Sequence, residues 1–295
     1  MNRITHPPSR PFSLHEALQQ LRRQPDSVIL AGGTHNFSGS PIPLSQQIPH
    51  PQIISLDRIE ELRRVSRTDR YLEFGACVSM QRILQLGTQI LPAPLRSCME
   101  QIGTPGLRRL ATIGGNLMIP ESSIGIGIVA AALDGLVEIR RIGESRWIPI
   151  IRLYNARRGL EPGELLTRIR IPNHFPTHSI YKRFGSPYDR TTHPLGICAA
   201  ATLEKNSVER FIFLAGDVNQ PLIRDRELEA DIVGQRTPFT TKEYQVFQDR
   251  WKRTLESHNL SPIQIERSSR MFVSFLIDLG DTPRGLSSDA NAPIV

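Results

Sequence analysis

The spacing of hydrophobic positions predicts short helices and strands along most of the chain. Near the N-terminus, Leu14, Leu18 and Leu21 recur at the spacing of one face of a helix. Ser13 precedes this run and Glu16 lies three residues later, which is the arrangement of a capping box. A helix is therefore expected to begin at about residue 14.

Short apolar runs separated by turn residues continue this alternation through the first part of the chain. A strand at 27–31 leads into two adjacent glycines, and a proline-rich stretch reaches residue 51. The further strands are expected at 52–56, 71–78, 137–142 and 165–171, and the helices at 79–86, 94–102 and 124–133.

The composition changes at residues 172–178, where two prolines and two histidines occur. Beyond this point, strands at 180–184, 197–204 and 210–215 precede helices at 224–233, 242–257 and 263–279. Strands followed by helices are typical of an α+β domain. We therefore expect an α+β fold with one domain over 1–174, a smaller α+β domain over 178–281, and a disordered tail over 282–295.

Length and composition narrow the class of protein. A chain of 295 residues with 39% hydrophobic residues is large enough for one or two domains with a core. We find no apolar run long enough to cross a bilayer. The first residues contain no apolar h-region, so a signal peptide is not expected. Cys77, Cys98 and Cys198 are far apart, so they fit neither a disulfide framework nor a metal site. A reducing, cytoplasmic location is expected.

The net charge of +7 comes largely from dispersed arginine pairs. Such pairs are typical of solvated faces, and an acidic partner or an anionic ligand is the alternative. Nucleic acid is not expected as a partner, because the pairs are not clustered and aromatic residues are only 6%.

Two segments pair adjacent glycines with a threonine: AGGT at 31–34 and TIGGN at 112–116. Glycine allows a positive φ and the close approach of a ligand to the backbone. Successive amide groups in such a turn can bind an anion, although a glycine pair also occurs in ordinary turns. Neither segment matches G-x-G-x-x-G or a Walker A loop. The residues alone leave a phosphate-bearing cofactor and a plain turn open.

The order of several motifs resembles the FAD-binding (medium) subunits of molybdenum hydroxylases, such as bacterial xanthine dehydrogenase and aerobic carbon monoxide dehydrogenase. The motifs, from about Pro11 to Leu279, are PFSLHEAL, VILAGGT, IISLDRIEEL, LEFGACVSM, RRLATIGGN, ALDGLVEI and PGELLTRIRIP. The resemblance implies a FAD-binding domain of two subdomains, of the PCMH type, followed by the smaller α+β domain.

The resemblance also implies a place in an electron-transfer complex. In this family a molybdopterin-binding large subunit oxidises the substrate, and a two-iron two-sulfur small subunit relays the electrons. The FAD subunit passes them to NAD or another acceptor. A two-iron cluster needs four clustered ligands, so three scattered cysteines fit one component of such a complex, with no metal site or catalytic residue of its own.

The resemblance implies FAD contacts at both glycine segments and at three further positions. Ile102 corresponds to a residue near the isoalloxazine ring. Leu166 and Lys182 correspond to contacts at the flavin end, where a lysine would stabilise negative charge on the reduced ring. Core packing for Leu166 and a solvated side chain for Lys182 are the alternatives. The implied FAD-binding residues are Ile29, Leu30, Ala31, Gly32, Gly33, Thr34, His35, Asn36, Ile102, Thr112, Ile113, Gly114, Gly115, Asn116, Leu166 and Lys182.

One position departs from the family. Nine residues after Asn116 the family has an aspartate that bonds to FAD, and this chain has Gly125. Glu121, Ser122 or Ser123 would have to replace it. A lost charge-assisted hydrogen bond costs about 1.5–3 kcal/mol. The alternative is therefore a degenerate subunit that keeps the fold and its partners but binds FAD weakly or not at all.

Two further interpretations concern partners. A stand-alone FAD oxidase is not favoured, because no His or Cys lies where it would attach flavin covalently or act as a substrate base. Arg108 and Arg109 come just before the second glycine segment, so one of them is expected to face the cofactor or the iron–sulfur partner.

Overall fold

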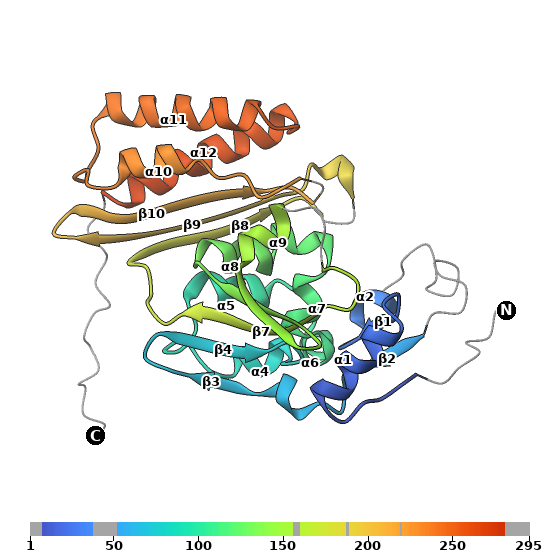
Figure 1. Cartoon of the computed structure of the whole chain (residues 1–295). Helices are drawn as coiled ribbons and strands as arrows, with labels where there is room; N and C mark the ends of the chain where they lie inside the picture. The colour runs from blue at the N-terminus through green and yellow to red at the C-terminus, as the bar shows by residue number, and fades with distance from the viewer. Residues whose placement is uncertain (1–7, 38–51, 156–159, 187–188, 219, 281–295) are drawn as a thin grey trace, which may run out of the picture. The chain divides into compact units, whose positions relative to one another are not determined.

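The computed structural model describes residues 8–37, 52–155, 160–186, 189–218 and 220–280 (Figure 1). The predicted tail at 282–295 lies outside the described residues. The chain forms two compact units, of which the first contains residues 1–175, 181–198 and 214–223. The second contains 176–180, 199–213 and 224–295. The domain boundaries proposed from the sequence stay a prediction.

The first unit begins with helix α1 (Leu14–Arg23), as predicted. The Ser13 hydroxyl accepts a hydrogen bond from the Glu16 amide at 3.1 Å, and the Glu16 carboxylate accepts one from the Phe12 amide at 2.9 Å. Strands β1 (Val28–Leu30) and β2 (Ile53–Ser55) follow and form a two-stranded parallel sheet. Helix α2 (Thr34–Phe37) starts directly after the first glycine pair.

A five-stranded sheet of order β3-β4-β7-β5-β6 forms the centre of the first unit. Its adjacent strands are antiparallel. The sequence missed the edge strand β6, because its half-exposed, charged residues hide the hydrophobic alternation. The bounds are β3 (Val65–Arg67), β4 (Tyr71–Gly75), β5 (Leu136–Arg141), β6 (Glu144–Pro149) and β7 (Leu165–Pro172), with a 3-10 helix η1 (Glu60–Arg63) before β3.

A buried ion-pair cluster joins the central strands of this sheet. Glu138 on β5 is 3% exposed, and its carboxylate accepts hydrogen bonds from Arg168 Nε at 2.8 Å and Arg140 Nη2 at 2.9 Å. The hydroxyl groups of Thr167 and Ser145 also donate to this carboxylate, at 2.7 and 3.0 Å. We call these five residues the Glu138 cluster. Every oxygen of the buried carboxylate therefore has a hydrogen-bond donor.

Short helices pack on one another beside this sheet (Figure 1). The segment expected to be a second glycine loop is instead the start of a helix, because the Thr112 hydroxyl accepts from the Gly115 amide at 3.1 Å as an N-cap. The helices are α4 (Met80–Leu84), α5 (Ala93–Glu100), α6 (Pro105–Leu110), α7 (Ile113–Leu117), η2 (Pro120–Ile124), α8 (Ile126–Ala132) and α9 (Ile150–Asn155).

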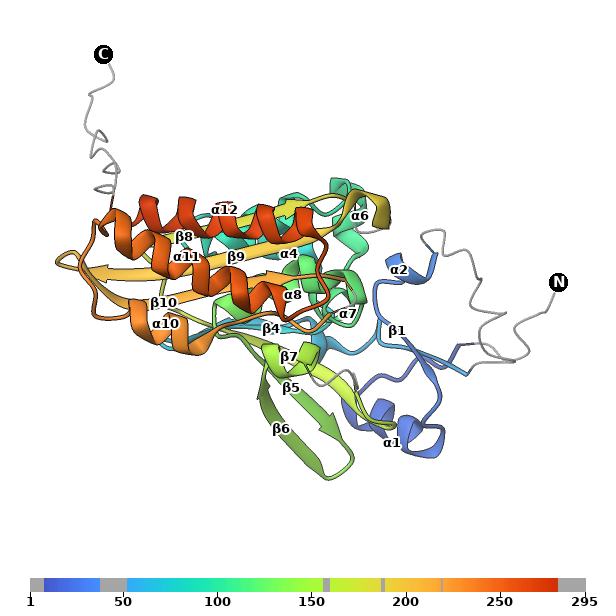
Figure 2. The same ribbon diagram turned by 90° about the horizontal axis from the view of Figure 1, so that it is seen from above.

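The C-terminal part contains the predicted three strands and three helices. The sheet has the order β10-β9-β8, and helices α11 and α12 lie side by side (Figures 1 and 2). In the second unit, the Phe213 ring lies 5.2 Å from Trp251 and 5.0 Å from Phe272, centroid to centroid. The bounds are β8 (His178–Phe184), η3 (Arg190–Thr192), β9 (Leu195–Glu204), β10 (Ser207–Gly216), α10 (Arg226–Ile232), α11 (Thr241–Glu256) and α12 (Pro262–Asp278).

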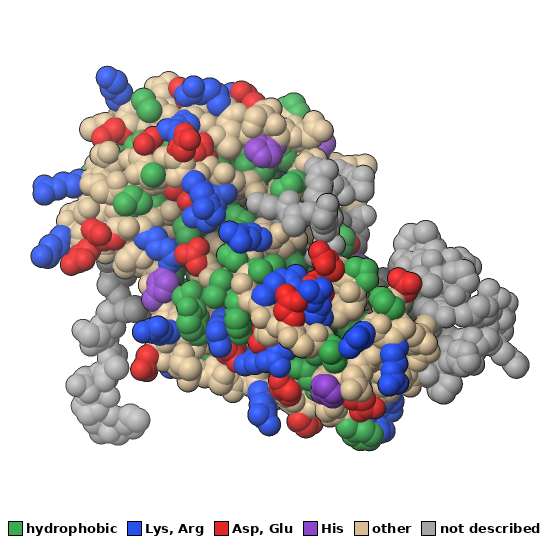
Figure 3. All heavy atoms as spheres, viewed as in Figure 1, with side chains coloured by type: hydrophobic (Ala, Val, Ile, Leu, Met, Phe, Trp, Pro, Cys, Tyr) green, Lys and Arg blue, Asp and Glu red, His purple; other side chains and the backbone are tan. Residues whose placement is uncertain are grey.

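The surface charge is mixed on the face seen in Figure 3. Lysine and arginine side chains there alternate with aspartate and glutamate over the described elements. This mixture is typical of solvated faces and differs from the single-sign patch that binds nucleic acid. Among the described helices, none combines the length and the apolar character that a membrane crossing requires.

Candidate cofactor-binding site

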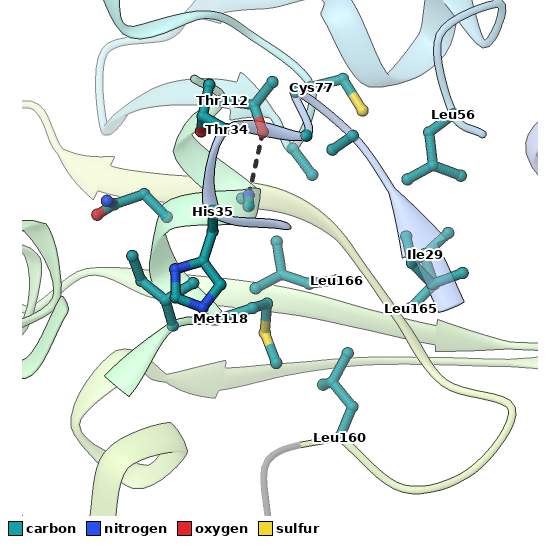
Figure 4. Close-up of a pocket in the computed structure, with 18 of the residues that line it drawn as sticks. Ile29, Thr34, His35, Leu56, Cys77, Thr112, Met118, Leu160, Leu165 and Leu166 are labelled. Carbon is teal, nitrogen blue, oxygen red and sulfur yellow. Dashed lines mark hydrogen bonds between the residues drawn. The ribbon is translucent and has the colours of Figure 1, made fainter. Parts of the chain in front are cut away.

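A cavity of about 580 Å³ lies in the first unit, and both glycine segments line it (Figure 4). This volume is within the range of small-molecule and cofactor sites. Leu30, Ile113 and Lys182 do not line the cavity, and the side chain of Asn36 lies outside the described part of the chain. The predicted site residues that line it are Ile29, Ala31, Gly32, Gly33, Thr34, His35, Ile102, Thr112, Gly114, Gly115, Asn116 and Leu166.

The first glycine segment follows the end of β1. Gly33 has a φ of +69°, a conformation that favours glycine. A Cβ on Gly32 would lie 2.0 Å from the Leu110 carbonyl oxygen, so Gly32 is required by packing. Within the described residues, the amides of Gly32 and Gly33 donate to no backbone acceptor. This segment therefore offers unpaired donors to a ligand in the cavity.

The second glycine segment has a different structure from the one expected. The Ile113 and Gly114 amides donate to the carbonyl oxygens of Val78 and Ala76, at 3.0 and 2.9 Å. The Gly115 amide donates to the Thr112 hydroxyl, and the Asn116 amide donates to the Thr112 carbonyl oxygen. The expectation that successive amides of this segment bind an anion is therefore wrong. Gly114 is required by packing, because its Cβ would lie 2.6 Å from that of Ala76.

Side chains replace those amides as donors at the second segment. The Thr112 hydroxyl accepts from Gly115 and retains its own hydrogen. Asn116 accepts from the Ser122 hydroxyl at 3.2 Å through Oδ1, which leaves its Nδ2 group as a donor. Among the described lining residues there is no lysine or arginine. An anion in this cavity would be held by uncharged donors.

Aliphatic side chains line the cavity on the side of β1 and β2. Leu21, Leu56 and Leu165 belong to one buried cluster, and Ile29 packs against it. Figure 4 shows Ile29, Leu56 and Leu165 grouped together, apart from Thr34 and Thr112. We call Leu21, Ile29, Leu56 and Leu165 the aliphatic end. The cavity thus combines polar groups with a separate apolar wall suited to a flat ring.

Arg108 has a structural role that the sequence did not indicate. Its Nη1 donates to the carbonyl oxygens of Glu100, Ile102 and Gly103, at 3.1, 3.1 and 2.8 Å. An arginine on carbonyls that follow a helix stabilises its C-terminal end. Neither Arg108 nor the exposed Arg109 lines the cavity. That one of them faces the cofactor or the iron–sulfur partner stays a prediction.

Position 125 is not part of the cavity lining, and neither are the three residues considered as its replacement. The Ser122 hydroxyl accepts from the Gly127 amide at 3.0 Å. The Ser123 hydroxyl donates to the carbonyl oxygens of Pro120 and Asp217, both at 2.9 Å. These contacts hold the chain around α8. The structure thus gives no support to the alternative of a degenerate subunit.

Sequence reasoning missed several parts of the wall, of which two are the most informative. Cys77 follows β4 and lines the cavity, and nothing in its neighbourhood of the sequence marks it. Residues 160–165 also line it. For this second part the dipeptide Pro162–Gly163 was an available turn signal.

Comparison with known proteins assigns the family. Residues 7–174 match the family described as FAD binding domain in molybdopterin dehydrogenase, and the chain belongs to this family. Aldehyde oxidase 2 of Cavia porcellus is 30% identical over 176 residues, which cover 55% of this chain and 13% of that protein. The nicotine 6-hydroxylase medium subunit of Paenarthrobacter nicotinovorans is 26% identical over 167 residues, covering 55% of this chain and 58% of that protein.

A solved structure shows the same fold along nearly the whole chain. Reconstituted CO dehydrogenase from Oligotropha carboxidovorans matches with a TM-score of 0.73 and 20% identity, over 94% of this chain and 97% of that chain. This match confirms the α+β fold. The family match confirms the resemblance and FAD as the family's cofactor, and places the chain among the components of oxidoreductases.

Proposed function

We propose that this chain is the FAD-binding electron-transfer subunit of a multi-subunit molybdenum hydroxylase of the xanthine dehydrogenase type. The observation that carries the proposal is that two glycine segments, about 80 residues apart in the sequence, line one cavity of about 580 Å³. Each segment brings donors to it. The family match supplies the cofactor class.

The residues present fit FAD. The Gly32 and Gly33 amides, the Thr112 hydroxyl and the Asn116 amide group would hold the pyrophosphate with uncharged donors. The aliphatic end offers an apolar wall to a ring. FAD, when bound, supplies two-electron redox chemistry. The chain's part is to bind and orient it. Lys182 stays a predicted contact, although it is exposed on β8 and does not line the cavity.

The proposal includes partners. We infer that electrons arrive from a two-iron two-sulfur small subunit, which receives them from a molybdopterin-binding large subunit. They leave to NAD or another acceptor, in the cytoplasm. A medium subunit among the relatives supports such an assembly. Within the described residues, no group of three or more His, Cys, Asp or Glu side chains could hold a metal ion, so the metals would belong to the partners.

Titration of the full chain with FAD tests the proposal. We expect binding of one FAD with a dissociation constant below about 1 μM, measured by calorimetry, and the absorbance bands of a bound flavin. Gly106→Ala should bind FAD like the wild type, because a Cβ there would meet only Thr104 Oγ1 at 3.7 Å. It is the matched control for a substitution at Gly32. A folded preparation that stays colourless after soaking in excess FAD contradicts the proposal.

Alkylation of Cys77 gives a second readout of the cavity. Burial raises the pKa of this thiol to about 12, and the side chain lines the cavity. Since the thiolate is the nucleophile, the rate of Cys77 alkylation should keep rising with pH beyond 9. Saturating FAD should slow it about tenfold or more by covering the thiol. Peptide mapping by mass spectrometry measures the extent of alkylation at each cysteine over time.

The other two cysteines are the internal control. Cys98 and Cys198 are 1% and 0% exposed and do not line the cavity. Their slow alkylation requires the protein to open, so FAD should slow it only as far as it stabilises the folded state. Any slowing of Cys77 beyond that of Cys98 and Cys198 reports direct coverage by the cofactor. Equal Cys77 rates with and without FAD would place the cofactor outside this cavity.

A further inference from the structure

The segment before β7 forms a tight turn at the cavity wall. The Glu164 amide donates to the Glu161 carbonyl oxygen at 3.0 Å, and Gly163 has a φ of +82°. Proline at the second position and glycine at the third are typical of a type II turn, here with Pro162 before Gly163. Each residue from 160 to 165 lines the cavity. The position of this turn therefore sets the shape of the wall.

The Glu164 carboxylate fastens the turn to the five-stranded sheet. Its Oε2 accepts from the Glu161 amide at 3.0 Å, and its Oε1 pairs with Arg146 Nη1. Arg146 on β6 is opposite Ile139 of β5, and Leu166 of β7 is opposite the same Ile139 from the other side. The Arg146 side chain thus reaches across one strand to hold the turn.

The Glu164 carboxylate is buried and is fully hydrogen-bonded within the protein. The Glu164 side chain is 2% exposed, and burial by itself would raise its pKa. The hydrogen bonds from Arg146 and from the Glu161 amide outweigh burial, so the pKa lies below its ordinary value. Both carboxylate oxygens are committed to these partners. Glu164 therefore acts on a ligand through the turn.

The turn borders the aliphatic end of the cavity. Gly163 approaches the backbone of Leu21, since a Cβ on it would lie 4.0 Å from the Leu21 carbonyl oxygen. On the rim of the cavity, Leu107 and Met118 are 37% and 39% exposed. A redox ring must reach electron donors and acceptors outside the chain. FAD bound with its isoalloxazine at this rim would have its adenine at the aliphatic end, where Leu21, Leu56 and Leu165 are buried.

We propose that the Arg146–Glu164 ion pair positions the Pro162–Gly163 turn as the wall of an adenine site, which makes the cavity select FAD over the mononucleotide FMN. This inference rests on the proposed function. The ion pair would act on the adenosine half of FAD, which FMN lacks. Breaking the pair should weaken only ligands that carry adenine.

Calorimetric titration of the full chain with FAD, ADP and FMN tests this assignment. In Glu164→Gln, and in Arg146→Met at the more exposed partner, we expect FAD and ADP to bind about tenfold or more weakly, because the wall is no longer pre-organised. FMN should bind as to the wild type. Glu144→Gln is the matched control, because Glu144 lies on the same hairpin but pairs with Arg141 at the surface.

The outcomes separate the two proposals. Wild-type chain that binds no FAD overturns the proposed function together with this inference. Wild type that binds FAD, with both variants unchanged for FAD and ADP, overturns only the inference. Equal weakening of FMN also overturns it, since a general loss of folded protein affects all three ligands alike. Thermal unfolding of each variant without ligand identifies such a loss.

Discussion

Gly32→Ala is expected to lower the free energy of unfolding by about 3 kcal/mol and to abolish FAD binding. The added Cβ would lie 2.0 Å from the Leu110 carbonyl oxygen and 2.9 Å from its carbon. Both atoms belong to the backbone, so no side-chain rotation relieves the clash. The first glycine segment must move away from α6, and the cavity between them changes shape. Urea unfolding followed by circular dichroism measures the first effect, and FAD titration the second.

Gly106→Ala in α6 serves as the control for the same chemical change. With space for its Cβ, it should leave the stability equal or raise it by up to about 1 kcal/mol, since alanine favours a helix over glycine. Equal unfolding midpoints for the two variants would contradict the packing role of Gly32.

Glu138→Gln is expected to destabilise the fold by about 3 kcal/mol, because it removes the charge at the centre of the Glu138 cluster. Arg168 would then face an uncharged glutamine at position 138, while its other hydrogen bond, to Glu73 at 3.0 Å, remains. Glu144→Gln, which affects only an exposed pair with Arg141, should cost less than about 1 kcal/mol. A change at position 138 no larger than that at 144 would show that the cluster adds nothing to stability.

The same carboxylate gives the protein a pH dependence. Burial would raise the pKa of Glu138, but the hydrogen bonds from Thr167 and Arg140 and the charge of Arg168 bring it below the ordinary 4.5. A group with a lowered pKa stabilises the fold above its unfolded-state pKa, and this contribution is lost as the pH falls through the folded-state value. The stability difference between wild type and Glu138→Gln should therefore be full above pH 4.5 and shrink below it. An unchanged difference at low pH would contradict this.

Much of the fold follows from the sequence, because its main elements bury regular hydrophobic patterns. Helix α1 and the three strands and three helices of the C-terminal part lie where the pattern predicts them. The edge strand β6 was missed because one face of it is exposed and carries charges. Helix α7 was missed because two of its five residues are glycines, which disfavour a helix, and its start depends on the Thr112 cap.

The sequence indicated segments that line the cavity but not how their groups are bonded. The glycine pairs correctly marked two segments that line one cavity. They could not show that Gly32 and Gly114 are needed against Leu110 and Ala76, since a glycine looks the same beside a ligand and beside a backbone. The Arg146–Glu164 pair joins residues 18 apart through a strand between them, and no local pattern announces such a contact.

The two-stranded sheet of β1 and β2 has a consequence for how a cofactor enters. This sheet shares no strand with the five-stranded sheet, and each of its strands has three residues. So small a sheet is held mainly by the apolar cluster beneath it. Its local opening costs less than opening of the larger sheet. We therefore expect the wall that carries the first glycine segment to open at a lower free-energy cost than the five-stranded sheet, which would give a ligand a way in while that sheet stays folded.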